Sequence, residues 1–441
     1  MSQQPYGLVL SGGGAKGAFE MGVWKALRES DYSLGAVIGT SVGALNAAMI
    51  AQDDYEIAME FWSNLTINQV LDLNKEMTNT YVDKWSKESF DVFRTGFLAA
   101  LFSDGLDISP LRHNLTRMIC EDTIRRSTIR FGLVTVDITS LKPRQLMIED
   151  IPNGQLIDYL LASAALPIFQ KLEIDGKTYL DGGFFDNVPI NFMLEQHFNQ
   201  IISVEFPAPG MRKWVRDKQA KIITVNNSEY LGGVLDFDSR QIELNIQLGY
   251  LDALKVFGLV DGRYFYLNTK KSNTFFRKFI NTLGQPLSNQ KQLQKMLALL
   301  CLSPDAGKND VLRTLENLLQ KTSFRNQPLS LAMLEITGKS VGVPRLENYS
   351  IDFFIQAILK ELNRLLDENL NLLDNPKIIG TFFTPANSSL LRYNFITFYL
   401  VFLSIRGDLS PERMSTFLSK FSPDIALSMI TVFYIHEVIN H

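Results

Sequence analysis

Hydrophobic runs and glycine-rich turns alternate through the first part of the chain. An apolar run from Gly7 to Leu10 leads into glycines and then into helix-forming residues from Ala18 to Leu27. The same order recurs downstream, where the apolar run Ala36-Val37-Ile38 precedes the turn from Gly39 to Gly43 and the helix-forming stretch from Ala44 to Met49. This pattern predicts two successive units of strand, tight turn and helix.

The pattern changes past about residue 270. Leucine-rich segments recur there at helical spacing and glycine becomes rarer, so we predict a helical C-terminal domain, residues 271–441, after an N-terminal domain, residues 1–270. Ser-Pro and Thr-Pro pairs mark helix starts, because proline fits the first helical position. The longest apolar run, Phe395 to Ile405, is too short to span a bilayer and is expected to form a buried helix. The helical spacing is seen in Phe354, Ile358, Leu362 and Leu365, and the start signals are Ser303-Pro304, Thr384-Pro385, Ser410-Pro411 and Ser422-Pro423.

The composition is that of a globular protein with a large core. Of the 441 residues, 46% are apolar, and the net charge of −4 does not suggest a nucleic-acid partner. Cys120 and Cys301 form no disulfide framework, so a reducing compartment is expected. Residues 1–5 are polar and offer no signal peptide. We therefore expect a cytoplasmic protein, while delivery by a specialised export machine stays open.

Ser41 is the candidate nucleophile. It lies at the centre of Gly39-Thr40-Ser41-Val42-Gly43, in the predicted turn between strand and helix. Glycines flank such a serine because the turn is too tight for Cβ atoms on both sides, and the strain exposes the hydroxyl in a cleft at the top of a sheet. Taken alone, the motif also fits a flexible turn.

The upstream segment Gly12-Gly13-Gly14-Ala15-Lys16-Gly17 is a candidate anion site. Glycines at a helix N-terminus leave several backbone N–H groups pointing into one concavity. The anion is either a phosphate, in a nucleotide site, or the oxyanion formed when Ser41 attacks an ester. We disfavour the nucleotide site, because the second strand ends without the acidic residue that holds a ribose, and because Lys16 precedes Gly17 instead of following it.

A serine nucleophile needs a base, and Asp181 is the best candidate. None of the four histidines, His113, His197, His436 and His441, sits at a glycine- or turn-marked strand end. Asp181-Gly182-Gly183, in contrast, places a carboxylate at the end of a predicted strand, after the apolar segment Leu172-Glu173-Ile174 and a turn at Asp175-Gly176. An ordinary Asp-Gly hairpin turn is the alternative.

These three motifs, in this order, resemble those of the patatin-like phospholipase family. Segments around Asp137, from Ala162 to Pro167 and from Asn187 to Pro189 are also similar to the family, so the resemblance covers most of residues 6–270. It implies an α/β fold whose three-layer core holds a central mixed sheet between helices. It also implies a Ser41–Asp181 dyad that needs no histidine. The matching motifs place Gly12, Gly13 and Gly14 in the oxyanion hole and include Lys16, Gly17, Gly39, Gly43, Gly182 and Gly183 as supporting residues.

The expected reaction is hydrolysis of carboxyl esters in lipids, of the phospholipase A or lysophospholipase type. It proceeds through an acyl-Ser41 intermediate with Asp181 as general base. No cofactor or metal is implied, since neither Asp236-Phe237-Asp238 nor Asp175-Gly176 has the ligand spacing of a calcium loop. Two alternatives stay open: an esterase or thioesterase that acts on a soluble substrate, and an interaction protein with an inherited hydrolase fold. For Lys16, the alternatives are steering of an anionic headgroup and simple exposure to solvent.

Three segments are candidates for contact with lipid. The segments from Met211 to Lys218 and from Lys270 to Phe279 mix cations with large aromatic residues, a composition suited to anionic membrane surfaces. The alternative is a solvated face with its aromatic residues in the core. The segment from Phe90 to Phe102 is a candidate lid or acyl-binding wall, or equally part of the core. We therefore expect peripheral membrane contact, and a protein partner or activator acting through residues 271–441 stays open.

Overall fold

The computed structural model describes residues 4–72, 105–269, 300, 302, 308–369 and 422–439. Its contacts divide the chain into two compact units, Met1–Phe257 and Gly258–His441. The domain limits of 1–270 and 271–441 stay a prediction. The candidate lid, the candidate membrane segment that begins at Lys270, the apolar run from Phe395 and three of the four predicted helix starts lie outside the described residues.

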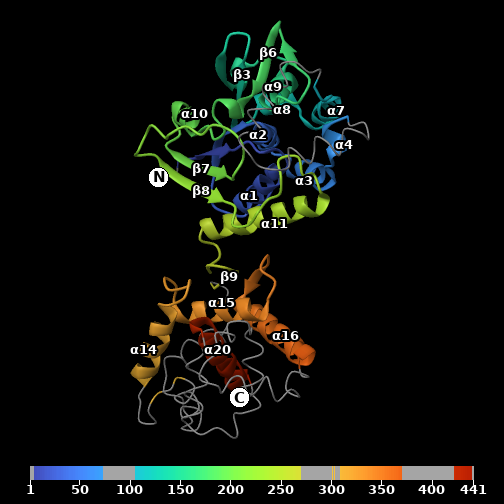
Figure 1. Cartoon of the computed structure of the whole chain (residues 1–441). Helices are drawn as coiled ribbons and strands as arrows, with labels where there is room; N and C mark the ends of the chain where they lie inside the picture. Colours follow the sequence, from blue (N-terminus) through green and yellow to red (C-terminus); the bar gives the residue numbers. More distant parts are fainter. Residues whose placement is uncertain are drawn as a thin grey trace. The chain divides into compact units, whose positions relative to one another are not determined.

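A mixed sheet of eight strands forms the centre of the first unit (Figure 1). The strands are β1 (Tyr6–Leu10), β2 (Leu34–Thr40), β3 (Arg130–Asp137), β4 (Lys142–Met147), β5 (Leu172–Ile174), β6 (Lys177–Asp181), β7 (Gln200–Glu205) and β8 (Lys221–Asn226). Their order is β5-β6-β3-β2-β1-β7-β8, and β4 also pairs with β3. The strands β3, β2, β1, β7 and β8, which are neighbours in this order, are parallel. β4 and β6 run antiparallel to β3. The parallel strands therefore all end at one edge of the sheet, which we call the carboxyl edge.

Helices cover both faces of this sheet, which confirms the predicted fold class. They are α1 (Ala18–Arg28), α2 (Val42–Gln52), α3 (Tyr55–Asn64), α4 (Ile67–Val70), α7 (Ser109–Met118), α8 (Glu121–Arg125), α9 (Leu156–Ser163), α10 (Ile190–Glu195) and α11 (Ser239–Val256), with 3₁₀ turns η1 (Gly14–Gly17), η2 (Ile148–Asp150) and η3 (Gly182–Phe184). Residues of α10 pack against Val9, Ile38 and Ile201. The alternate positions Leu8 and Val37 point to the opposite face and are also buried.

α1 and α11 cross so closely that glycine is required at the crossing. A Cβ atom on Gly22 would lie 1.9 Å from the carbonyl oxygen of Ile246, and one on Gly249 would lie 1.9 Å from that of Phe19. Both clashes are with backbone atoms, so rotation of a side chain cannot relieve them. The backbone of α11 thus packs directly on the helix that follows the glycine-rich loop.

The second unit is helical, as predicted, and has its own core. Its described helices are α14 (Lys308–Leu319), α15 (Leu329–Val341), α16 (Ile351–Asn369) and α20 (Pro423–Ile439), the last of which begins at the predicted Ser422-Pro423 start. Phe354, Ile358 and Leu362 are buried in this core at the predicted helical spacing. The sequence did not predict the short parallel pair of β9 (Tyr266–Asn268) and β10 (Asn348–Ser350). Within the described ranges, the helices are too short or too polar to cross a bilayer.

The helix crossing gives a stability prediction. Gly249→Ala places a methyl group against backbone, so we expect α1 and α11 to separate and the free energy of unfolding to fall by at least about 2 kcal/mol. Glu243→Ala, at an exposed position of the same helix, is the matched control and should stay within about 0.5 kcal/mol of the wild type. Urea denaturation of both variants measures the difference, and equal stability would contradict this account of the crossing.

Candidate active site

Ser41 occupies a strained turn between β2 and α2. Its backbone has φ 57° and ψ −129°, a region that residues with a side chain rarely adopt. The chain turns so tightly that a Cβ atom on Gly39 would lie 2.0 Å from the carbonyl oxygen of Gly43. A Cβ atom on Gly43 would in turn lie 2.6 Å from the carbonyl oxygen of Leu10. Both flanking glycines are therefore required by backbone packing.

The turn is held by Ser163, at the end of α9. The Ser163 hydroxyl accepts a hydrogen bond from the Ser41 N–H (3.0 Å) and donates one to the carbonyl of Val134 in β3 (2.7 Å). Thr135 reinforces the same junction, because its hydroxyl lies 2.9 Å from the carbonyl oxygens of Ala162 and Leu180. A single serine side chain thus ties the nucleophile turn to the sheet.

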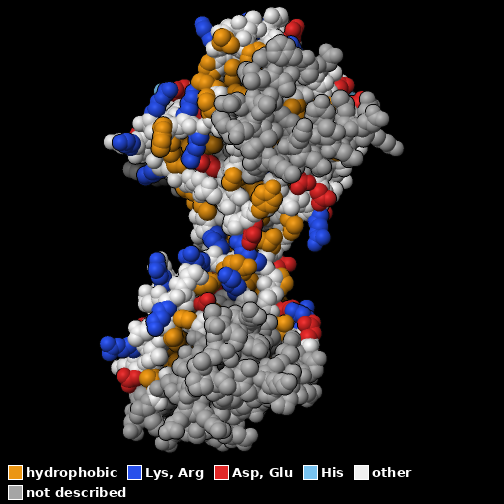
Figure 2. All heavy atoms as spheres, in the orientation of Figure 1, with side chains coloured by type: hydrophobic (Ala, Val, Ile, Leu, Met, Phe, Trp, Pro, Cys, Tyr) orange, Lys and Arg blue, Asp and Glu red, His pale blue; other side chains and the backbone are white. Residues whose placement is uncertain are grey.

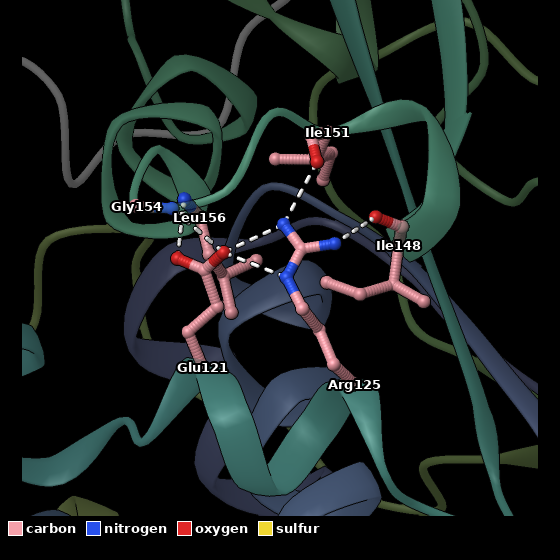
Figure 3. A network of polar contacts seen from close by, with 6 residues as sticks. All are labelled: Glu121, Arg125, Ile148, Ile151, Gly154 and Leu156. Carbon is pink, nitrogen blue, oxygen red and sulfur yellow. Dashed lines mark hydrogen bonds and ion pairs between the residues drawn. The ribbon is translucent and has the colours of Figure 1, made fainter.

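The start of α9 is fixed by a compact polar network (Figure 3). The Arg125 guanidinium donates to the carbonyls of Ile148 and Ile151 and forms an ion pair with Glu121 at 2.6 Å. The Glu121 carboxylate also accepts the N–H groups of Gly154 and Leu156, which open α9. The network thus anchors the end of α9 opposite to Ser163.

Strand register places Asp181 level with Ser41. Thr40 of β2 pairs with Val134 of β3, and the next residue of β3, Thr135, pairs with Asp181 of β6. Because neighbouring strands lie about 4.8 Å apart, Asp181 lies two strand spacings from the nucleophile turn, on the same level of the sheet. The Asp181 N–H is further held by the carbonyl of Ala165 at 2.9 Å.

The Asp181 carboxyl is buried and only half satisfied. Its Oδ1 accepts the N–H of Gly183 at 2.7 Å, while Oδ2 has no partner with normal hydrogen-bond geometry among the described residues. Burial raises the pKa of Asp181 to about 6, although the neighbouring Ser41 hydroxyl and the Gly183 N–H both lower it. Desolvation outweighs these contacts, because a buried carboxylate loses its hydration. The carboxyl is therefore more basic than an ordinary aspartate.

The glycine-rich loop lies against the same turn. A Cβ atom on Gly12 would lie 3.0 Å from the Cβ atom of Ser41, so this glycine makes room for the Ser41 side chain. The Gly12 N–H donates to the carbonyl of Asn187 (3.2 Å), and the Asn187 amide donates back to the carbonyl of Gly12 (3.1 Å). The Gly13 and Gly14 N–H groups have no acceptor among the described residues. They are the two free donors of the loop.

Lys16 is buried, which neither sequence-based alternative anticipated. It is 2% exposed, and its ammonium group donates to the carbonyl of Pro207 at 2.6 Å. The lysine therefore neither faces solvent nor reaches out to a headgroup. It ties η1 to the loop that follows β7. No local pattern could predict this contact, because 191 positions separate the two residues.

An apolar pocket of about 540 Å³ opens at Ser41. Residues from η1, α2, α3, α4, α7 and the segments around Ala164 and Leu235 line it, and they include Gly14, Ser41, Val42, Leu45, Asn46, Phe61, Trp62, Leu65, Val70, Leu111, Ala164, Leu166, Phe169, Leu235 and Phe237. The lining is almost wholly hydrocarbon, which suits an alkyl chain.

A buried hydrogen-bond network that sequence reasoning missed underlies this pocket. The Asn46 amide donates to the Glu20 carboxylate (2.7 Å) and to the carbonyl of Gly17 (3.0 Å), and it accepts the indole N–H of Trp62 (2.9 Å). Burial raises the pKa of Glu20 well above its usual range. The network fixes three helices around the glycine-rich loop. In the sequence, the one hint of this network is that Glu20 stands between the apolar residues Phe19 and Met21.

No histidine is among the residues that line the pocket. His113 lies on α7, and His197 follows α10. No group of three or more His, Cys, Asp or Glu side chains is arranged to hold a metal ion in the part of the chain that the structure describes. Ser41, Asp181 and the glycine-rich loop, in contrast, are brought together at the carboxyl edge.

Comparison with known proteins finds a matching family model, similar sequences and a structure that aligns with the chain. Residues 8–194 match the family model described as patatin-like phospholipase. The chain is 25% identical over 206 residues to the lysophospholipase NTE1 of Yarrowia lipolytica (46% of this chain, 13% of that protein) and 28% identical over 204 residues to the neuropathy target esterase sws of Drosophila melanogaster (45% and 13%). It thus spans only a small part of the length of these relatives. A solved structure, VipD from Legionella pneumophila, aligns with a TM-score of 0.38 at 14% identity, covering 83% of this chain and 87% of VipD.

The burial of Asp181 predicts that ionisation of its carboxyl lowers the free energy of unfolding. Its folded-state pKa of about 6 exceeds the unfolded value of about 3.9, so ionised Asp181 destabilises the fold, and this penalty grows as the pH rises from about 4 to about 6 and stays constant above that. We expect Asp181→Asn to raise the free energy of unfolding by about 1 to 3 kcal/mol at pH 7. The gain should vanish below pH 4, where the carboxyl is neutral in both states. Urea titrations at several pH values measure it, and a gain independent of pH would refute the assignment.

Proposed function

The N-terminal part of this chain belongs to the patatin-like phospholipase family, and from that premise we propose that the protein is a lipid acyl hydrolase of the phospholipase A or lysophospholipase type. The observation that carries the proposal is the shared site: a strained serine, a buried carboxyl at the same level of the sheet, and an apolar pocket that opens at that serine. The chemistry is that of a serine–aspartate dyad acting on a carboxylic ester.

The first step is acyl transfer to Ser41. The Ser41 oxygen attacks the ester carbonyl while Oδ2 of Asp181, the oxygen without a partner, takes the hydroxyl proton. The Gly13 and Gly14 N–H groups stabilise the oxyanion, a contribution worth roughly 3 kcal/mol for each donor. The tetrahedral intermediate then collapses to acyl-Ser41. The alcohol leaves with the proton that Asp181 had taken.

The second step regenerates the enzyme. A water molecule attacks the acyl carbon, Asp181 takes its proton, and the same N–H groups hold the second oxyanion. Collapse of this intermediate releases the fatty acid and returns the proton to Ser41. A base with a pKa near 6 is ionised at neutral pH and more basic than an exposed aspartate. Burial therefore supports both steps.

The proposed substrate follows from the pocket. An almost wholly apolar lining beside Ser41 favours an alkyl chain over a polar acyl group. A lipid ester would place its chain there and its scissile carbonyl near the Gly14 N–H. The headgroup side would then face away from the hydrocarbon lining. A fatty-acyl chain is thus the part of the substrate that we propose is recognised.

The dyad is tested by fatty-acid release from phospholipid vesicles. Ser41→Ala and Asp181→Asn should each lower the release rate by at least about a thousandfold, because each removes a group that takes part in both steps. Addition of calcium or a chelator should leave the wild-type rate unchanged. Activity that survives Ser41→Ala would mean another nucleophile. Hydrolysis of soluble short-chain esters without release from vesicles would favour the soluble-ester alternative.

The pH profile assigns the base. Because Asp181 must be ionised to accept the proton, kcat/KM should fall about tenfold for each pH unit below 6 and level off above it. Asp186 is the matched control, because burial also raises its pKa to about 6 while it lies outside the dyad. Asp186→Asn should keep the acid limb. Loss of the acid limb in Asp186→Asn would mean that Asp186, and not Asp181, is the group that titrates.

Chain-length preference tests the pocket. Val70→Trp should fill part of it and lower the rate on long-chain relative to short-chain esters by about tenfold. Ile57→Trp, at an exposed position of α3, is the control and should leave the ratio unchanged. A series of p-nitrophenyl esters gives the ratio directly. An unchanged ratio in Val70→Trp would place the alkyl chain elsewhere.

A further inference from the structure

The loop between β7 and β8, residues 206–220, which we call the crossover loop, presents an unusual side chain to solvent. Trp214 is 94% exposed and is the most exposed large hydrophobic side chain among the described residues. Met211 of the same loop is 50% exposed. An indole left in water contributes nothing to the core, so the fold does not explain it.

The backbone beneath this indole is nevertheless fixed. Asn191 of α10, itself 5% exposed, donates from its side-chain amide to the carbonyl of Trp214 (2.9 Å). Its side-chain oxygen accepts the N–H of Arg216 (2.9 Å). The two bonds hold the backbone from the carbonyl of Trp214 to the N–H of Arg216. The exposed indole is thus held at a defined place and is not the tip of a loose loop.

The crossover loop is bonded to the segment that carries the proposed base. The Met211 N–H donates to the carbonyl of Gly183 (2.8 Å), and the Met211 carbonyl accepts the N–H of Asn187 (2.6 Å). Asn187 in turn holds Gly12 of the glycine-rich loop, and Pro207 holds Lys16. The loop therefore lies at the carboxyl edge, continuous with the site of the proposed chemistry.

The charges beside Trp214 point cations outward. Arg212 pairs with Glu205 at 2.7 Å, and its side chain is 59% exposed while that of Glu205 is 10% exposed. Arg216 pairs with Glu195 at 3.1 Å, with exposures of 72% and 49%. Figure 2 shows blue cationic and orange hydrophobic side chains interspersed on the side of the first unit that carries α10, β7 and β8 in Figure 1. Guanidinium groups around an indole suit a layer of phosphate groups.

From these observations we propose that the crossover loop is the surface by which the protein docks on a phospholipid bilayer, with Trp214 inserted at headgroup depth and Arg212 and Arg216 on lipid phosphates. The inference rests on the proposed function, since a lipid acyl chain must leave a bilayer to reach Ser41. A bilayer fits better than a protein groove, because the loop exposes a single indole with the partly exposed guanidinium groups of Arg212 and Arg216 near it in the chain.

Vesicle binding tests the proposal in proteins that carry Ser41→Ala, so that hydrolysis does not alter the lipid. Co-sedimentation with mixed phosphatidylcholine and phosphatidylglycerol vesicles should show that Trp214→Ala lowers the partition coefficient about tenfold, whereas Trp214→Phe retains most of it. Phe353→Ala removes an aromatic side chain that is 74% exposed in the second unit and is the matched control. It should leave binding unchanged.

Further measurements separate the outcomes. With Ser41 intact, Trp214→Ala should hydrolyse soluble short-chain esters at the wild-type rate, which shows that the fold and the chemistry are retained. Unchanged vesicle binding in Trp214→Ala would overturn the docking surface, as would an equal loss in Phe353→Ala. A wild-type dimer that Trp214→Ala dissociates, measured by sedimentation, would overturn the bilayer in favour of a second copy of the chain. Vesicle binding that depends on Trp214 without any fatty-acid release would keep the docking surface and reject the proposed function.

Discussion

The strained turn at Ser41 is the constraint on which the rest of the site depends. A serine with a positive φ persists only where its surroundings fix the backbone. Here the surroundings are the close approach of Gly39 to Gly43 and the hydroxyl of Ser163, which accepts the Ser41 N–H. The network around Glu121 and Arg125 anchors the other end of α9. Elements far from Ser41 are thus arranged to hold its backbone.

Burial of acidic groups is the second feature of this architecture. Glu20, Asp181 and Asp186 are all almost fully buried, and burial raises the pKa of each. Such groups lower stability when they ionise, because a buried carboxylate loses its hydration. In the proposed mechanism the same apolar surroundings make Asp181 a better base and strengthen hydrogen bonds to an oxyanion. Stability and catalysis are therefore opposed at this residue.

The loops at the carboxyl edge act as one assembly. Asn187 bonds to Gly12 in both directions and to Met211, and Lys16 bonds to Pro207. The glycine-rich loop, the segment after Asp181 and the crossover loop consequently share their hydrogen bonds. A surface that docks through the crossover loop would be bonded to Gly183 and Asn187, which follow the proposed base Asp181 in the chain. The second unit has a separate core, centred on residues such as Phe354 and Ile358.

The sequence by itself determined the local elements and the identity of the candidate groups. Strand, turn and helix around Ser41 follow from an apolar run, flanking glycines and helix-forming residues, which act between near neighbours, and the helix that begins at Pro423 follows from a local capping signal. Only the tertiary structure decided which groups meet. The level pairing of Asp181 with the nucleophile turn, the hold of Ser163 on Ser41, the burial of Lys16 and the exposure of Trp214 all depend on strand register and on contacts between distant segments. Such contacts leave no periodic signal in the chain, because they are set by how the packed layers fit together.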